Sequence, residues 1–241
     1  MPTLSAAGQL PRLSFLPACS DLRRFAGTLP VVYDWSFNEN TVPLGIRALG
    51  KDWFEKNLAL KTALHEAWLN STDGDRRRIC DWYIQTWGGI RRNTEENLCL
   101  YGTGDEESIL ARGVRGMASW SKALTIRNPN TFAIADARTC ISLNAIQLLA
   151  DAPDIRIFPS LPSRNSRVPR AQRVVSRLRA ERKLRSVESR GCYLKYNKLL
   201  IDVANAVGRG VTNQMVEMLL FAQADKLSED LINRHAYPDS Y

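Results

Sequence analysis

The chain has 241 residues, 44% of them hydrophobic, and a formal net charge of +8 at pH 7. This length suffices for one large domain or two small ones with a sizeable apolar core. Neither a long apolar run nor a basic stretch leading into one occurs, so we expect no transmembrane helix and no signal peptide. The five scattered cysteines, without a CxxC pair, and the two histidines disfavour structural zinc, other metals and a disulfide framework. We expect a cytoplasmic protein without a cofactor.

The predicted elements are mainly helical, and the fold class expected is mainly α. Residues 1–30 are rich in Pro and Ser and are predicted to form an irregular arm before one helical domain over residues 31–241. Gly88 and Gly89 are expected to end a helix. Apolar residues at helical spacing predict helices over residues 44–49, 51–69, 75–87, 105–112, 117–126, 137–150, 170–189, 193–207 and 211–227.

Aromatic, amide and basic side chains gather in the segment 81–93. Aromatic faces and amide groups suit a pocket that holds a base taken out of the DNA stack. Core packing is the alternative for the aromatics, and a solvated loop is the alternative for the basic residues. The candidate pocket residues are Tyr83, Gln85 and Trp87, and the candidate contacts to phosphate or an unpaired base are Arg91, Arg92 and Asn93.

Gly113 and Gly116 bracket a turn between two predicted helices. Glycine adopts positive φ without steric cost, and a phosphate can approach a backbone that carries no side chain. The amides of Gly116, Met117 and Ala118 would then face an anion at a helix N-terminus, with Ser119 in the same turn. A hairpin of two helices that binds no ligand is the alternative.

Asp136 follows this hairpin and opens the next predicted helix. Residues 128–130, Asn-Pro-Asn, end the preceding helix, and Phe132 and Ile134 are expected to anchor a short extended piece in the core. Aspartate is a favoured N-cap, so capping alone explains its position. A rigid carboxylate flanked by Arg138 also suits stabilisation of an oxocarbenium-like sugar, or activation of an attacking water.

The excess positive charge lies in one segment. Residues 164–198 contain 12 Lys/Arg and 2 Glu, a net of +10, and the rest of the chain holds 21 basic and 23 acidic residues. A local basic stripe favours a polyanionic partner, and a solvated helix face is the alternative. The best candidates for phosphate contacts are Arg164, Arg167, Arg170, Arg173, Arg177 and Lys183.

The order of these elements resembles the helix-hairpin-helix DNA glycosylase superfamily, which includes the 8-oxoguanine and 3-methyladenine glycosylases. The likeness covers residues 105–150, and SWSKAL…NPNTFAIADAR extends it loosely to residues 75–205. It implies a glycosylase fold, a hairpin that binds phosphates of double-stranded DNA, and excision of a modified base with Asp136 essential for catalysis. The hairpin and catalytic segment is therefore placed at residues 105–150.

Two positions depart from the superfamily pattern. Val114 and Arg115 separate the two glycines, where the superfamily has a single residue. Ala118 stands where bifunctional members carry a nucleophilic lysine, which implies a monofunctional enzyme that uses water. Lys122, one turn further along the helix, is the second candidate nucleophile. The alternative for Lys122 is a phosphate-binding or solvent-exposed lysine.

The pattern also resembles a bacterial set of 8-oxoguanine-glycosylase-fold proteins. Some of these act in phage defence, and one type removes glucosylated hydroxymethylcytosine from phage DNA. The resemblance thus implies either phage defence or base excision repair. Two other functions stay open, namely a non-catalytic DNA-binding module in which Asp136 only caps, and a protein-interaction domain whose basic helix binds an acidic partner.

Overall fold

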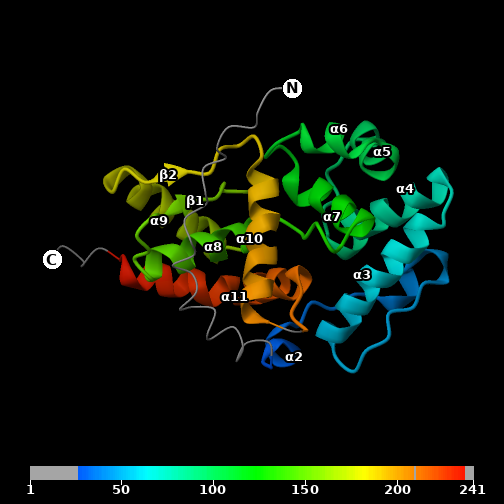
Figure 1. Ribbon diagram of the computed structural model, residues 1–241, viewed down its shortest axis with the longest axis horizontal. Coiled ribbons are helices and arrows are strands. Elements are labelled where there is room, and N and C mark those ends of the chain that lie inside the picture. Colours follow the sequence, from blue (N-terminus) through cyan, green and yellow to red (C-terminus); the bar gives the residue numbers. More distant parts are fainter. Residues whose placement is uncertain (1–26, 209, 237–241) are drawn as a thin grey trace.

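The computed structural model describes residues 27–208 and 210–236, and the fold is mainly α-helical, as the sequence predicts (Figure 1). The predicted arm lies outside the described residues up to residue 26. The elements in chain order are α2 (Leu29–Val32), η1 (Glu39–Thr41), η2 (Pro43–Gly45), α3 (Trp53–Leu69), α4 (Asp73–Asp81), η3 (Trp82–Trp87), α5 (Glu95–Thr103), α6 (Glu106–Leu110), α7 (Met117–Arg127), α8 (Ala137–Leu149), β1 (Arg156–Ile157), α9 (Arg167–Glu181), β2 (Arg185–Ser186), α10 (Cys192–Val207) and α11 (Asn213–Arg234).

The helices form two groups with α10 standing between them (Figure 1). On one side α8, α9 and α11 pack on one another beside a two-stranded parallel sheet of β1 and β2. On the other side α3, α4, η3 and α5 surround α7. One apolar core runs through both groups, and a smaller cluster joins α2, α3 and α11. Side chains from α3, α7, α8 and α11 can therefore meet inside the molecule.

Most of the predicted helices are confirmed. Those expected at 51–69, 105–112, 117–126, 137–150 and 193–207 correspond to α3, α6, α7, α8 and α10. The helix expected at 44–49 is wrong, because Leu44 and Gly45 have φ of 58° and 67°, which no right-handed helix accommodates.

Three further differences have local causes. No helix was expected at 95–103, yet α5 begins there because Thr94 Oγ1 accepts a hydrogen bond from Asn97 N at 3.2 Å. Helix α9 ends at Glu181 rather than 189, and Lys183 then has φ of 52°. The two short strands were not predicted, since two residues are too few to show an alternating pattern.

The helix expected over 75–87 changes type at its middle. It is an α-helix to Asp81 and a π-helix from Trp82 to Trp87, and it ends at Gly88 and Gly89 as predicted. A π-helical turn is wider than an α-helical one and occurs often at functional sites. This wide turn packs against α7.

Two general properties of the described residues bear on function. Their four cysteines are free thiols, three buried and one exposed. Along residues 27–208 and 210–236, we find no helix that combines the length and the apolar character needed to cross a bilayer.

Candidate functional site

Asp136 is positioned by the extended segment 132–135, which lies buried between α7, α10 and α11. Buried backbone groups need hydrogen-bond partners, and here side chains of the three helices provide them. The segment, and with it Asp136, is therefore fixed from three sides. The contacts are Tyr193 Oη to Ala133 O at 2.9 Å, Ala133 N to Asn197 Oδ1 at 2.7 Å, Tyr196 Oη to Ile134 O at 2.6 Å, Ala135 N to Ser121 Oγ at 3.1 Å, and Gln214 Nε2 to Phe132 O at 2.6 Å.

Asp136 is the N-cap of α8, as the sequence predicts, and the cap uses a single carboxylate oxygen. Oδ1 accepts from Arg138 N at 2.8 Å and from Thr139 N at 3.0 Å, while Asp136 N donates to Thr139 Oγ1 at 3.0 Å. Within the described residues, Oδ2 accepts no hydrogen bond. Capping thus orients the carboxylate and leaves one oxygen for chemistry.

Lys122 lies inside the molecule on α7. The residue is 3% exposed, and Nζ donates to Ala118 O at 2.8 Å, one turn earlier in the same helix. Burial lowers the pKa of Lys122, and the nearby carboxylates of Asp136 and Glu217 oppose that fall. The alternative of a solvent-exposed lysine is wrong, because Lys122 is buried.

Gly88 makes room for the Lys122 side chain. A Cβ at Gly88 would lie 2.5 Å from Lys122 Cε and 2.8 Å from the carbonyl oxygen of Ile84. Gly88 itself has φ of −83°, so its backbone does not require glycine. The end of the π-helical turn therefore touches the candidate nucleophile directly.

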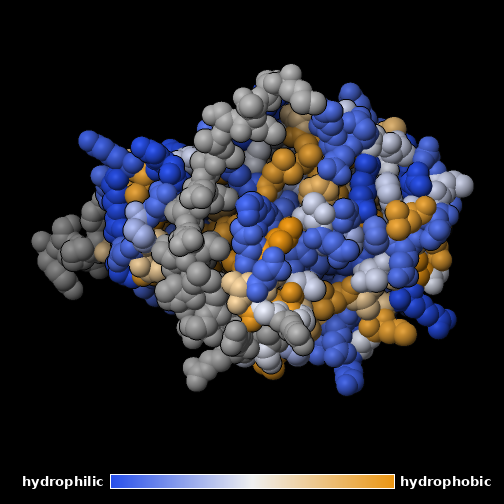
Figure 2. Space-filling model, viewed as in Figure 1, coloured by the Kyte–Doolittle hydropathy of each residue, from blue (hydrophilic) through white to orange (hydrophobic). Residues whose placement is uncertain are grey.

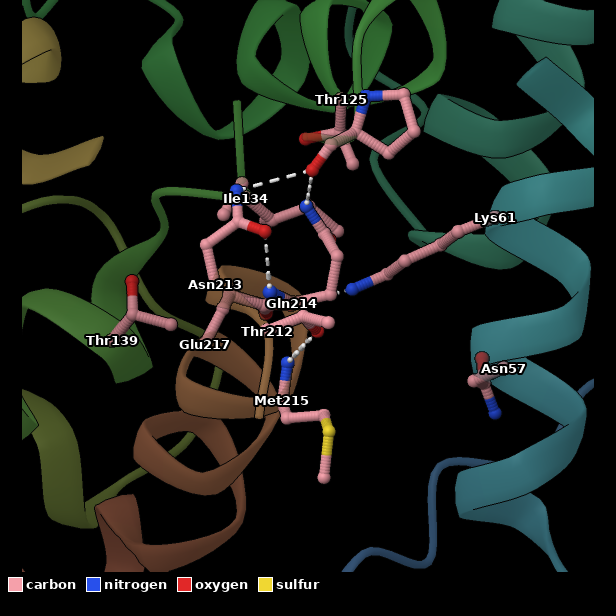
Figure 3. A network of polar contacts seen from close by, with 12 residues as sticks. Asn57, Lys61, Thr125, Ile134, Thr139, Thr212, Asn213, Gln214, Met215 and Glu217 are labelled. Carbon is pink, nitrogen blue, oxygen red and sulfur yellow. Dashed lines mark hydrogen bonds and ion pairs between the residues drawn. The ribbon is translucent and has the colours of Figure 1, made fainter. Parts of the chain in front are cut away.

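Lys61 and Glu217 form a buried ion pair beside these groups. Lys61 Nζ lies 2.6 Å from Glu217 Oε2, and the two side chains are 3% and 4% exposed. Figure 3 shows Lys61 pointing from α3 toward the start of α11. Burial raises the pKa of Glu217, and Lys61 limits the rise. We call the three buried residues Lys61, Lys122 and Glu217, together with the half-buried Asp136, the buried cluster.

Neither Lys61 nor Glu217 was predicted from the sequence as a site residue. The available signal was a lone charge within an apolar run: Glu217 stands in VEMLL, and Lys61 lies between Leu60 and Leu64. A charged residue at a core position is costly unless it is paired, so such a residue deserves a functional hypothesis.

The expected base-pocket aromatics border the buried cluster and also belong to the core. Tyr83 and Trp87 stack with ring centroids 4.3 Å apart, and Trp87 Nε1 donates to Asn57 Oδ1 at 2.8 Å. The Tyr83 hydroxyl and Trp35 Nε1 are buried without a hydrogen-bond partner among the described residues. Trp35 meets Trp87 edge to face at 5.9 Å. Gln85 is half-buried.

The turn between α6 and α7 has the expected glycine conformations. Gly113 and Gly116 have φ of 55° and 70°. Met117 N donates to Val114 O at 3.4 Å, so this amide already has an acceptor. The amides of Gly116 and Ala118 have none among the described residues. The side chains of Met117 and Ser119 are buried.

The polar and basic side chains predicted to bind DNA differ in whether they already have partners within the protein. Arg138 forms an ion pair with Asp225 at 2.7 Å and lies over the ring of Phe221, so its guanidinium is engaged. Asn93 donates to Ile90 O at 3.0 Å. Exposed guanidinium groups belong to Arg91, Arg92, Arg164, Arg167, Arg170 and Arg173.

The basic segment covers α9, β2 and the first part of α10, and Figure 2 shows strongly hydrophilic side chains over α9 and β2. Its first residue comes close to the end of the π-helix, since Arg164 Nη1 lies 3.9 Å from the point where a Cβ of Gly89 would stand. Further along, a surface hollow between α9 and α11 is lined by Arg170, Arg173, Val174, Arg177 and Ile232.

Comparisons of the chain with protein-family models, with curated proteins and with solved structures gave no match. The helix-hairpin-helix resemblance therefore stays a prediction, carried by residues 105–150 of this chain.

Proposed function

We propose that the protein is a DNA glycosylase that excises a modified base, with Lys122 and Asp136 at the reacting centre. The observation that carries the proposal is a buried lysine within electrostatic reach of a half-buried carboxylate that has a free oxygen. A lysine whose pKa is lowered by burial supplies the neutral amine, which is the nucleophilic form. The Asp136 carboxylate supplies the negative charge that a developing sugar cation needs.

In the proposed reaction, the neutral amine of Lys122 attacks C1′ of the deoxyribose. The C1′–Nζ bond forms as the glycosidic bond breaks, and the base leaves with the bonding electron pair and takes up a proton. Asp136 Oδ2 stabilises the positive charge on the sugar. Nζ then loses a proton, and the C1′–O4′ bond breaks as the second Nζ proton passes to O4′, which gives an imine. Water hydrolyses the imine to an abasic site and free Lys122.

Two sets of groups are candidates for DNA recognition, one for a flipped base and one for the phosphates. The unpartnered groups of Tyr83 and Trp35 are hydrogen-bond donors for a flipped base. The amides of Gly116 and Ala118 and the exposed arginines suit phosphates.

The test incubates the full chain with duplexes that contain 8-oxoguanine, 3-methyladenine or glucosylated hydroxymethylcytosine. Alkali reveals abasic sites, and borohydride reduces an imine to a stable protein–DNA adduct. We expect base release and an adduct, both lost in Lys122→Met and kept in Lys226→Met, whose lysine is exposed on α11 and paired with Asp230.

Each other outcome is informative. Base release without an adduct would mean that water and not Lys122 is the nucleophile, as expected for a monofunctional enzyme. Tight binding with no release from any duplex would favour a non-catalytic DNA-binding module. Release of the glucosylated base alone would point to phage defence, and release of 8-oxoguanine to repair.

A further inference from the structure

The buried cluster holds two lysines and two carboxylates, but only one of the lysines forms an ion pair. Lys61 and Glu217 form the close ion pair of 2.6 Å. The Lys122 ammonium instead donates to a backbone carbonyl, and among the described residues no carboxylate lies within ion-pairing distance of it. A lysine left without a counter-ion in a buried site loses its proton more easily than a paired one.

The two lysines lie on the faces by which α3 and α7 contact each other. One turn after Lys61, His65 Nδ1 lies 2.7 Å from Ile126 O, which is one turn after Lys122. One turn before Lys61, Asn57 accepts from Trp87, whose neighbour Gly88 touches the Lys122 side chain. Lys61, the ion-pair partner of Glu217, and Lys122 therefore lie on helices that contact each other.

We propose that Lys61 is a positioning residue that ties up Glu217, so that Glu217 cannot become the counter-ion of Lys122. This proposal rests on the proposed glycosylase function, which needs Lys122 as a neutral amine. Lys61 also adds a like charge, and both effects favour the neutral form of Lys122.

The ionisable groups around Lys122 support this arrangement. After burial, the influences on its pKa are Asp136 and Glu217, which raise it, and Lys61, which lowers it. Other ionisable side chains that face α7 from neighbouring helices are His65 on α3, Cys80 on α4, Tyr101 on α5 and Tyr193 on α10.

Opposite substitutions of the pair should act in opposite directions. In Lys61→Met, Glu217 loses its partner and holds Lys122 as the ammonium, so the adduct should form about tenfold more slowly at pH 7 and recover at higher pH. In Glu217→Gln, the rise of rate with pH should move to lower pH. A residue pair that only stabilises the fold would slow both variants alike.

The experiment measures the Lys122 amine directly as well as the reaction. Protein labelled with ¹⁵N-lysine is titrated with pH, and the Lys122 Nζ signal is assigned by its loss in Lys122→Met. We expect the titration midpoint to rise in Lys61→Met and to fall in Glu217→Gln. Adduct formation with the best duplex is followed over the same pH range.

The double variant Lys61→Met/Glu217→Met covers the case in which a single variant does not fold, since an apolar pair often replaces a buried ion pair without loss. The Lys122 titration midpoint of the double variant should lie below the midpoint of Lys61→Met. If Lys61→Met does not fold, the midpoint of the double variant is compared with the wild-type value, which it should lie near. Midpoints that do not move in any variant would overturn the role of Lys61. Shifted midpoints without any adduct would refute the glycosylase reaction and leave the role of Lys61 intact.

Discussion

The buried cluster and the basic segment hold charge in opposite ways. The cluster brings Lys61, Lys122, Asp136 and Glu217 together from four elements, and both of its lysines are almost fully buried. The basic segment carries its arginines mainly along α9 and exposes most of them. Formal charge cancels in the cluster, whereas the segment has a net of +10.

This difference suggests that the basic segment attracts DNA and that the buried cluster carries out the reaction. Exposed charges are screened by salt over a Debye length of about 10 Å at 0.1 M, so the segment can steer and hold a polyanion but has no fixed reacting geometry. Buried charges are screened little, and burial lowers the pKa of Lys122. Salt should therefore change the DNA affinity through the basic segment, and pH should change the reaction rate through the buried cluster.

The largest effect should come from Asp136, and two substitutions separate its two roles. Asp136→Asn keeps an N-cap but loses the negative charge, so base release should fall about 10²- to 10³-fold with little change in melting temperature. Asp136→Ala should lose the same activity and also about 1 kcal/mol of stability. Rates of base release and thermal melting of both variants check this. Full activity in Asp136→Asn would mean that Asp136 only caps.

A smaller loss is expected from Gly88→Ala. The new methyl group would meet Lys122 Cε at 2.5 Å and push the amine away, and a displacement near 1 Å can cost about 10²-fold in rate. Gly74→Ala is the matched control, because its Cβ would meet only Thr72 Oγ1 at 3.9 Å. Adduct formation is measured for both. Equal rates would show that the Lys122 amine does not depend on the π-helical turn.

The parts of the site that could be predicted from the sequence are those set by local signals. Gly113, Gly116 and Asp136 follow from turn and capping preferences, which depend on a few neighbouring residues. The orientation of Lys122 could not be predicted in this way. Nearly every residue of α7 is buried, so the helix has no polar face that would show which side points to solvent.

The rest of the site depends on contacts across the chain. Lys61 and Glu217 are 156 residues apart, and no local preference joins them. The π-helical turn was expected as ordinary helix, because Ile79, Trp82 and Tyr83 fit a helical stripe whichever hydrogen-bond pattern forms. The turn packs against α7, a contact that the sequence pattern does not contain.

The rate of adduct formation should rise about tenfold per pH unit at pH values below the pKa of Lys122. Adduct formation needs neutral Lys122, so the rate should rise with pH and level off at the pKa of Lys122, which burial places below the ordinary 10.5. Because the cluster is buried, added salt should leave this midpoint in place. Single-turnover adduct formation across pH, at two salt concentrations and saturating protein, measures it. A rate independent of pH would exclude Lys122 as the nucleophile.

The smallest effect should come from the basic segment. Arg170→Gln/Arg173→Gln removes two exposed charges beside the hollow on α9, so DNA affinity at low salt should fall by a few fold. Each lost phosphate contact should also reduce the slope of log affinity against log salt by about 0.9. Arg78→Gln is the control, since Arg78 is exposed on α4 and paired with Asp75. If neither slope nor affinity changes, α9 does not carry the DNA. The pH midpoint of Lys122 should stay unchanged in both variants, because attraction and chemistry reside in different parts of the molecule.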